Sequence, residues 1–184
     1  MERMCPWWMG YGLASPLRRL SLNPEKLLAS FVTQGMTILE PGPGMGFFTL
    51  PLARMAGAAG RVVAVDVQQK MLDVLGRRAR RAGIADRIEI RLAGSGGLDV
   101  ADLADRVDFA LAFAVVHEVP DPGLFFRQVR AAMRRGGRVL FAEPQGHVTP
   151  SAFAASLEAA ARAGLVVRAA PVVRGSHAAV LEKA

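Results

Sequence analysis

Short apolar runs alternate along the chain with longer segments of helical periodicity. The apolar runs are rich in β-branched or aromatic residues and are bounded by turn residues, which is typical of strands; they cover residues 37–40, 62–65, 88–92, 107–113 and 138–142. The segments between them place apolar residues three and four positions apart, as one helix face does; they cover residues 47–55, 69–82, 122–133 and 151–163. Strands alternating with helices predict an α/β protein with a mostly parallel sheet.

Local signals mark the ends of several elements. Asn23 precedes Pro24, which resembles an N-cap followed by proline in the first turn and predicts a helix ahead of the first strand. Ser151 is the predicted cap of the last helix. Residues 165–174 and 177–182 are two strand patterns joined by a Gly-Ser turn, which predicts an antiparallel hairpin that closes the sheet.

Composition indicates a folded domain in a reducing compartment. The 184 residues are 52% hydrophobic and 21% charged, as in ordinary globular proteins. Cys5 is the only cysteine, so an internal disulfide and a thiolate cluster for a metal are excluded. No apolar stretch reaches the roughly 20 residues of a membrane span, and the N-terminal pattern is not that of a signal peptide. We expect one cytoplasmic domain, 1–184, in which residues 1–34 form a helical and aromatic cap or lid and residues 35–184 the core.

The net charge of +7 comes almost entirely from arginine, since only three of the 23 basic residues are lysine. Guanidinium groups suit a phosphate-rich partner. However, the arginine clusters within residues 77–81 and 127–135 fall on segments with helical apolar spacing, where charge normally forms a solvated face. We favour the solvated faces and expect no specific nucleic-acid partner.

A glycine-rich loop follows the first predicted strand and precedes a helix. Its sequence is Glu40-Pro41-Gly42-Pro43-Gly44-Met45-Gly46. Glycines let a backbone turn tightly and approach a ligand, with helix N-terminal amides nearby, although a plain connecting turn would look similar. Asp66 ends the second predicted strand, twenty residues beyond Gly46, where a carboxylate can accept hydrogen bonds from ribose hydroxyls. The combination predicts a nucleoside-binding sheet.

These motifs resemble those of the class I S-adenosylmethionine-dependent methyltransferases, in particular the small relatives of the ubiquinone/menaquinone-type enzymes. Residues 38–46 match the family's first motif, 62–66 the second, 107–121 the fourth and 133–140 the fifth. The resemblance implies a Rossmann-like sheet of seven strands in the order 3-2-1-4-5-7-6, with strand 7 antiparallel and helices on both faces. Nicotinamide-dependent enzymes also combine a glycine-rich loop with an acidic residue that binds the ribose. Their loop, however, is G-x-G-x-x-G rather than G-x-G-x-G.

The resemblance implies S-adenosylmethionine as the cofactor and no metal. The family usually has an acidic residue for the adenine amino group after the third strand, whereas this chain has Ala93-Gly94-Ser95-Gly96-Gly97 there. Ser95 or backbone carbonyls are the candidate substitutes. The implied cofactor-binding residues are Glu40, Gly42, Gly44, Gly46, Asp66, Val67, Ser95 and Phe113.

Two pairs of polar residues follow the fourth and fifth predicted strands, where open α/β sheets bind ligands. His117 and Glu118 follow the fourth strand, and Glu143 and His147 the fifth. The family's fourth-motif histidine lies beside the substrate cavity, so the resemblance makes His117 and Glu118 the candidate catalytic residues. The alternative is that His117 caps a loop while Glu118 is solvated. His177 is expected in the surface turn of the hairpin.

We therefore expect in-line methyl transfer to a small or lipophilic acceptor, aided mainly by proximity, which can supply roughly 7 to 11 kcal/mol of the barrier. A dedicated base is optional. The alternatives are an RNA or protein methyltransferase and a non-catalytic nucleoside-binding protein of the same fold. Trp7, Trp8 and Tyr11 are expected to form a lid, with a hydrophobic plug or a membrane-surface patch as alternatives. A homodimer is left open.

Overall fold

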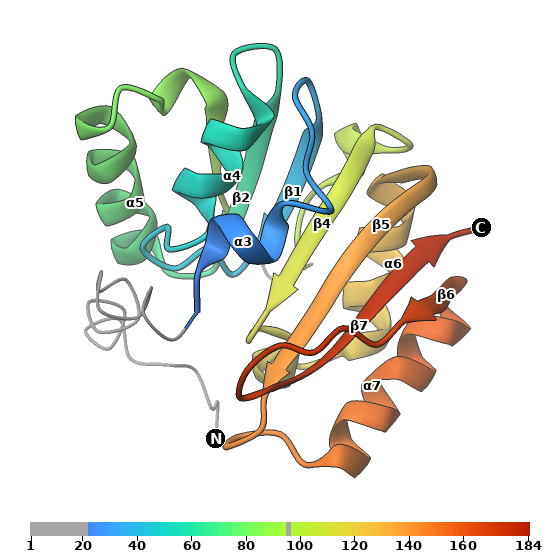
Figure 1. The fold of residues 1–184 in the computed structure, drawn as a ribbon. Coiled ribbons are helices and arrows are strands. Elements are labelled where there is room, and N and C mark those ends of the chain that lie inside the picture. Colours follow the sequence, from blue (N-terminus) through green and yellow to red (C-terminus); the bar gives the residue numbers. More distant parts are fainter. Residues whose placement is uncertain (1–21, 95–96) are drawn as a thin grey trace. The chain divides into compact units, whose positions relative to one another are not determined.

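The computed structural model describes residues 22–94 and 97–184, so the predictions for the N-terminal aromatic residues and Ser95 lie outside the described residues. The seven strands follow the order β3-β2-β1-β4-β5-β7-β6, which confirms the order that the resemblance implies. The chain divides into two compact units, Met1–Gly94 and Ser95–Ala184, which are described in turn (Figure 1). The division into a cap of residues 1–34 and a core stays a prediction.

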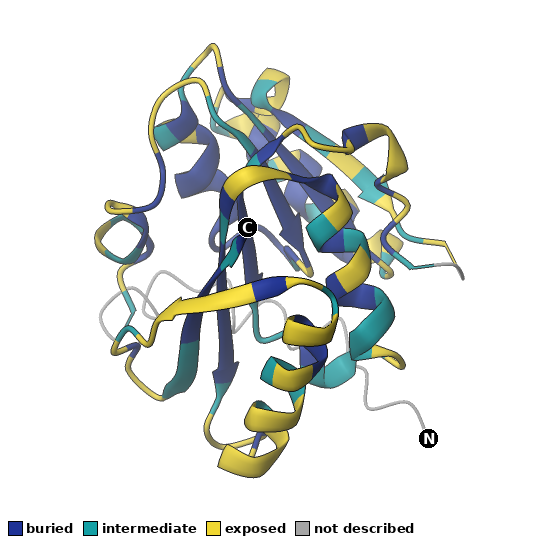
Figure 2. Cartoon of the chain, turned by 90° about the vertical axis from the view of Figure 1, so that its right-hand side faces the viewer, coloured by how far each residue is buried: buried dark blue, intermediate teal, exposed yellow. Residues whose placement is uncertain are grey.

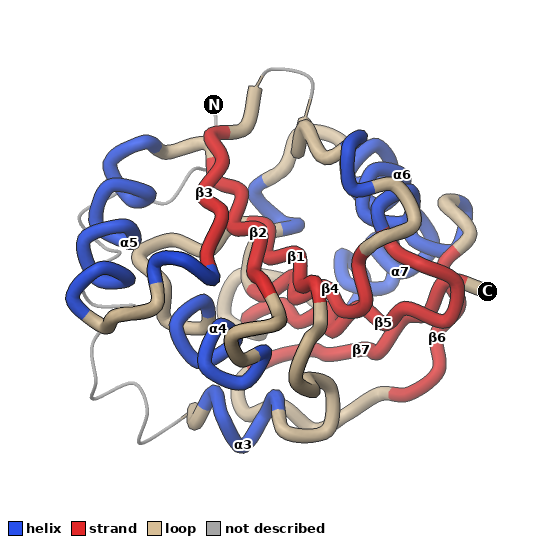
Figure 3. Tube along the Cα trace, turned by 90° about the horizontal axis from the view of Figure 1, so that it is seen from above, coloured by secondary structure: helices blue, strands red, loops and turns tan. Residues whose placement is uncertain are grey.

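The first unit contains three parallel strands, with β2 between β1 and β3. Figure 3 shows α4 and α5 beside these strands, with α3 next to α4. Asn23 caps α3 as predicted, because its side chain accepts a hydrogen bond from the Lys26 N–H. The elements are α3 (Pro24–Leu28), β1 (Thr37–Pro41), α4 (Thr49–Ala56), β2 (Arg61–Asp66), α5 (Gln69–Arg81), the 3-10 turn η1 (Ala85–Arg87) and β3 (Ile88–Leu92).

The second unit pairs β4 with β5 in parallel and ends in the predicted hairpin, because β7 runs antiparallel to both β5 and β6. Helices α6 and α7 lie side by side. The elements are η2 (Ala101–Leu103), β4 (Val107–Phe113), η3 (Val116–Glu118), α6 (Pro122–Ala132), β5 (Met133–Pro144), α7 (Pro150–Arg162), β6 (Leu165–Ala169) and β7 (Ser176–Lys183).

The core is built from the strands and from one face of each longer helix. Strands β1, β2 and β4 are buried over most of their length, as expected for parallel strands that are covered rather than half-exposed. Figure 2 shows buried strands and helices with exposed outer faces. No helix among residues 22–94 and 97–184 combines the length and apolar character needed to cross a membrane.

Three local predictions are wrong. Thr149, not Ser151, caps α7: its hydroxyl accepts a hydrogen bond from the Ala152 N–H, and Pro150 occupies the first turn. His177 lies within β7, opposite Glu143 of β5, rather than in the turn. Strand β6 ends at Ala169 instead of continuing toward residue 174; Pro171 follows two residues later and has no N–H for a ladder hydrogen bond.

Candidate functional site

The glycine loop between β1 and α4 needs its glycines for conformational reasons. Gly42, Gly44 and Gly46 have φ angles of 69°, 53° and 85°, a region that side chains disfavour. The Gly42 N–H donates to the Val65 carbonyl of β2 at 2.8 Å. At Gly46 a Cβ atom would lie 2.5 Å from Leu75 Cδ1. The loop is therefore a tightly specified backbone structure rather than a plain connection.

Asp66, at the end of β2, is tied to this loop through its carboxylate. Its Oδ2 accepts a hydrogen bond from the Gly44 N–H at 3.2 Å, and its Oδ1 accepts one from the Gln68 N–H at 2.9 Å. Burial raises the pKa of Asp66, and the backbone donors oppose that shift. The next residue, Val67, is 57% exposed. The second strand thus ends in a fixed acceptor followed by an exposed apolar side chain.

Glu40, in β1, is 3% exposed and carries a buried oxygen, Oε2, that has no hydrogen-bond partner. Burial raises its pKa from 4.5 to about 8, and the neighbouring Asp66 charge adds to the shift. The Thr49 hydroxyl faces the carboxyl and lowers the pKa, but the two side chains do not form a regular hydrogen bond, because Thr49 Oγ1 is also unpartnered. A buried carboxyl in this state favours a ligand that brings a donor or a positive charge.

Helix α5 packs one stripe of residues against the loop. A Cβ at Gly44 would lie 3.6 Å from Met71 Sδ, and Leu75 meets Gly46. On the same helix, Arg78 Nη1 donates to the Met45 carbonyl. The predicted solvated face is therefore wrong for Arg78. Its spacing of i, i+4 and i+7 from Met71 through Leu75 was the signal that could have identified it.

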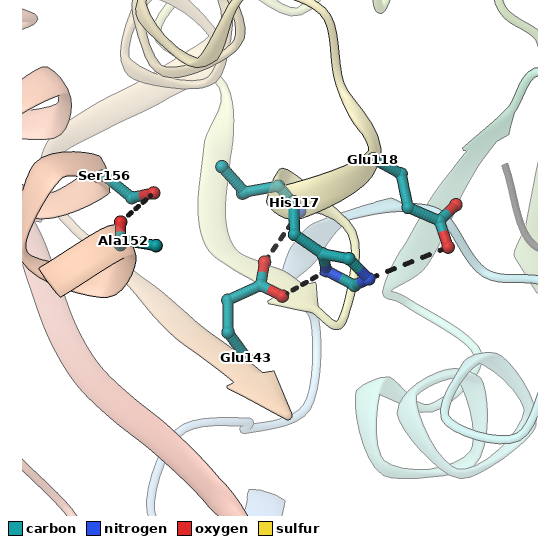
Figure 4. A network of polar contacts seen from close by, with 6 residues as sticks. His117, Glu118, Glu143, Ala152 and Ser156 are labelled. Atoms are coloured by element: carbon teal, nitrogen blue, oxygen red, sulfur yellow. Dashed lines mark hydrogen bonds and ion pairs between the residues drawn. The ribbon is translucent and has the colours of Figure 1, made fainter. Parts of the chain in front are cut away.

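In the second unit, buried Glu143 at the end of β5 pairs with half-buried His117 of η3, the turn that follows β4 (Figure 4). Glu143 is 1% exposed. Its Oε1 accepts a hydrogen bond from the Val116 N–H at 2.7 Å, and its Oε2 lies 2.5 Å from His117 Nδ1. Both carboxylate oxygens are therefore engaged with η3.

Glu118 lies on the other side of the His117 ring, with its Oε1 3.8 Å from Nε2 (Figure 4). The His147 ring is perpendicular to it, with 6.0 Å between ring centroids. The hydrogen bond to Glu143 raises the pKa of His117, and the charges of Glu143 and Glu118 add to the effect, while partial burial opposes it. This arrangement can accept a proton and stabilise the resulting imidazolium.

The structure thus gathers the predicted residues in two groups. In the first unit, Glu40, Asp66, Val67 and the three loop glycines surround the ends of β1 and β2. In the second unit, His117 and Glu118 lie with Glu143 and His147, and half-buried Phe113 ends β4. The role of Phe113 stays a prediction. Within the part of the chain that the structure describes, no group of three or more His, Cys, Asp or Glu residues is arranged to hold a metal ion.

The bond between Glu143 and His117 is the feature that sequence reasoning missed. The two residues lie 26 positions apart, and the sequence places each of them after a predicted strand without pairing them. The available signal was that β4 and β5 are parallel neighbours, so residues beyond their carboxyl ends emerge at the same edge.

The chain is similar to known methyltransferases in sequence and in fold. The sequence model of a family described as "Methyltransferase domain" matches residues 32–170. The chain is 31% identical over 144 residues to a ubiquinone biosynthesis O-methyltransferase of Caulobacter vibrioides, covering 71% of this chain and 55% of that protein. It is 30% identical over 121 residues to an arsenite methyltransferase of Halobacterium salinarum, covering 66% of this chain and 30% of that protein. The chain therefore spans about half of the length of these relatives, or less.

A solved structure of a SAM-dependent methyltransferase from Aquifex aeolicus has the same fold. The TM-score is 0.87 at 22% identity, and the superposition covers 98% of this chain and all of that one. Since the family model covers most of the chain and the strand order is that of the class I fold, the chain belongs to the S-adenosylmethionine-dependent methyltransferase domains.

Proposed function

We propose that the chain transfers a methyl group from S-adenosylmethionine to a small or lipophilic acceptor. The observation that carries the proposal is the link between Asp66 and the Gly44 amide, which joins the acid at the end of β2 to the glycine loop. When bound, the cofactor supplies a methyl group already activated on a sulfonium sulfur. The residues of the chain then need to hold the two reactants in line.

The residues of the first unit fit the chemistry of this cofactor. Asp66 offers carboxylate oxygens for the ribose hydroxyls, and exposed Val67 offers an apolar surface for the adenine ring. Unpartnered Oε2 of Glu40 suits the ammonium group of the methionyl part, because a nearby cation favours the ionised carboxylate. Gly42, Gly44 and Gly46 allow the backbone to approach the ligand closely.

His117 and Glu118 are the proposed catalytic residues on the acceptor side. They follow β4, and ligands of open α/β sheets bind at the carboxyl ends of strands. The names of several relatives support a small acceptor: besides the ubiquinone enzyme above, they include a catechol O-methyltransferase of Mycobacterium tuberculosis. The chain spans only part of the length of these relatives.

Removing the Asp66 carboxylate tests the cofactor site. Loss of a charge-assisted hydrogen bond costs about 1.5 to 3 kcal/mol, so Asp66→Ala should weaken binding of S-adenosylhomocysteine at least about tenfold. Isothermal titration calorimetry measures the affinity. Asp73→Ala, which removes an exposed carboxylate of α5, is the matched control and should bind like the unaltered protein. Unchanged affinity in Asp66→Ala would remove Asp66 from the site, and tighter binding of NAD than of S-adenosylhomocysteine would contradict the proposed function.

A further inference from the structure

Glu143 is not part of the proposed cofactor site, yet its carboxylate is buried. A buried charge is costly unless it is hydrogen-bonded, and both oxygens of Glu143 have partners in η3, the Val116 N–H and His117 Nδ1. Ala114, between β4 and η3, adopts a positive φ of 55°, which is unfavourable for residues other than glycine. The chain is thus turned so that η3 presents these two groups to Glu143.

We propose that Glu143 is a positioning residue that holds His117 with its Nε2 as the proton acceptor, and that the methyl acceptor is a hydroxyl group that loses its proton during transfer. This inference rests on the proposed methyltransferase function and names the class of its acceptor.

The tautomer follows from the partners of the imidazole ring. An ionised carboxylate only accepts hydrogen bonds, so the contact of 2.5 Å requires the proton on Nδ1. In the neutral ring, Nε2 then carries the lone pair. A carboxylate that fixes the Nδ1 proton is also how a catalytic triad prepares its histidine as a base.

The charges around His117 favour the protonated product of this step. Glu143 of β5 and Glu118 of η3 both stabilise an imidazolium, and His147, from the segment after β5, approaches the ring edge-to-face. His177 of β7 lies opposite Glu143 in the strand register. A base strengthened in this way is better matched to a weakly acidic hydroxyl than an ordinary histidine.

The need for a base selects among acceptors. A thiolate or a tertiary amine attacks a methyl group with a lone pair that it already has, so it has no proton to lose. A hydroxyl oxygen forms the new O–C bond while the C–S bond breaks, and the electron pair of that bond stays on sulfur as a neutral thioether. The hydroxyl proton moves to His117 Nε2, and the imidazolium later releases it to water.

The tautomer can be measured without knowing the acceptor. The chain has only three histidines, so ¹⁵N NMR of the imidazole nitrogens is assignable with His147→Gln and His177→Gln. We expect the Nδ1-protonated form of His117 at high pH. In Glu143→Gln the amide can donate toward Nδ1, so the Nε2-protonated form should replace it and the titration of His117 should move to lower pH. The control Glu158→Gln, an exposed carboxylate of α7, should change neither.

Turnover tests the acceptor class, with catechol as the hydroxyl probe and, as comparisons, trimethylamine and a thiol that is ionised at the assay pH. We expect catechol to be methylated, with a rate that rises as His117 loses its proton. Glu143→Gln should lower kcat by about 10²-fold or more, as loss of general-base catalysis does, with KM and the affinity for S-adenosylhomocysteine nearly unchanged.

Each contrary result has a separate meaning. An Nε2-protonated His117 in the unaltered protein, or an unchanged pH profile in Glu143→Gln, overturns the positioning role. Methylation of the amine or the thiol but not of catechol, or no turnover of catechol by protein that binds S-adenosylhomocysteine, overturns the hydroxyl class. Failure to bind S-adenosylhomocysteine overturns the proposed function itself.

Discussion

Glu40 and Glu143 are both buried acids near the ends of parallel strands, but their environments differ. Each oxygen of Glu143 meets a partner from η3, so this side chain is fully satisfied without a ligand. Oε2 of Glu40 has no partner, and its pKa is raised to about 8. Burial without a partner favours the neutral acid, whereas hydrogen bonds to the carboxylate favour the charged form. The two residues are therefore prepared for different tasks, one to receive a ligand and the other to orient a histidine.

Glu40→Gln should change how stability depends on pH. Below pH 4.5 the carboxyl is protonated in the folded and the unfolded states and has no effect. Between pH 4.5 and about 8 only the folded state keeps the proton, so the free energy of unfolding falls as pH rises, by about 1.4 kcal/mol per unit of pH at most. Above about 8 the decline ends. The variant lacks the titration, so its stability should be flatter and higher at neutral pH.

Urea unfolding at pH 5, 6.5, 8 and 9 measures this difference, with Glu158→Gln as the exposed control. Parallel curves for Glu40→Gln and the unaltered protein would show that Glu40 titrates normally. If Glu40 also meets the cofactor's ammonium group, the more stable variant should bind S-adenosylhomocysteine more weakly, a common relation between stability and function at binding sites.

At the scale of elements, α5 is the support of the glycine loop. Met71, Leu75 and Arg78 lie on one face of this helix and meet the loop at Gly44, Gly46 and Met45. Apolar contact alone would leave the Met45 carbonyl without this donor, and a polar group near the core is costly when unpaired. The helix thus holds the loop in place through both side-chain packing and one hydrogen bond.

Gly46→Ala and Gly35→Ala separate packing from backbone strain. Their φ angles are nearly equal, 85° and 83°, but a Cβ at Gly35 would meet nothing within 4 Å, whereas one at Gly46 would lie 2.5 Å from Leu75 Cδ1. Each variant should lose about 1 to 2 kcal/mol for the left-handed conformation, and Gly46→Ala about 1 to 3 kcal/mol more for overpacking. Denaturant unfolding measures both. Only Gly46→Ala should weaken S-adenosylhomocysteine binding. Equal losses of stability in the two variants would mean that Leu75 moves aside without a cost in free energy.

The sequence predicts elements well where one signal dominates. The strands at residues 88–92 and 107–113 have the predicted bounds, because their apolar runs end at turn residues. Strand β5 begins at Met133, five residues earlier than predicted, since Arg134, Arg135 and the two glycines hide the strand pattern. At α7, Thr149 and Ser151 are both good caps, and the preference of proline for the first helical position selects Thr149.

The candidate site is likewise predictable only where its signals are local in the sequence. The loop and Asp66 are recognisable because their residue types and spacing are local properties of two strand ends. The pairing of Glu143 with His117 depends on which strands are neighbours and on the positive φ of Ala114. Alanine carries no sequence signal for that conformation, since glycine or asparagine is its usual occupant. Only the three-dimensional structure shows this contact.

At the scale of the whole molecule, the charge of +7 comes almost entirely from arginine, and most arginines within residues 22–94 and 97–184 are exposed. Arg77, Arg80 and Arg81 are exposed along α5, whereas Arg78 of the same cluster binds the loop. A field of this sign attracts any polyanion without reading its sequence. It therefore predicts non-specific attraction to polyanions and gives no support to a particular RNA substrate.

RNA binding should accordingly show little sequence preference and a strong dependence on salt concentration. Two unrelated single-stranded RNAs should bind alike in fluorescence anisotropy, with log K falling linearly against log salt by about 0.7 per phosphate contact. The combined variant Arg77→Gln, Arg80→Gln and Arg81→Gln should reduce that slope by up to about 2, because three contacts at about 0.7 each are removed. It should leave methylation of catechol unchanged, since these side chains lie outside the proposed site. Stoichiometric methylation of one RNA position at 200 mM salt, lost in the triple variant, would instead establish the RNA methyltransferase as the correct alternative.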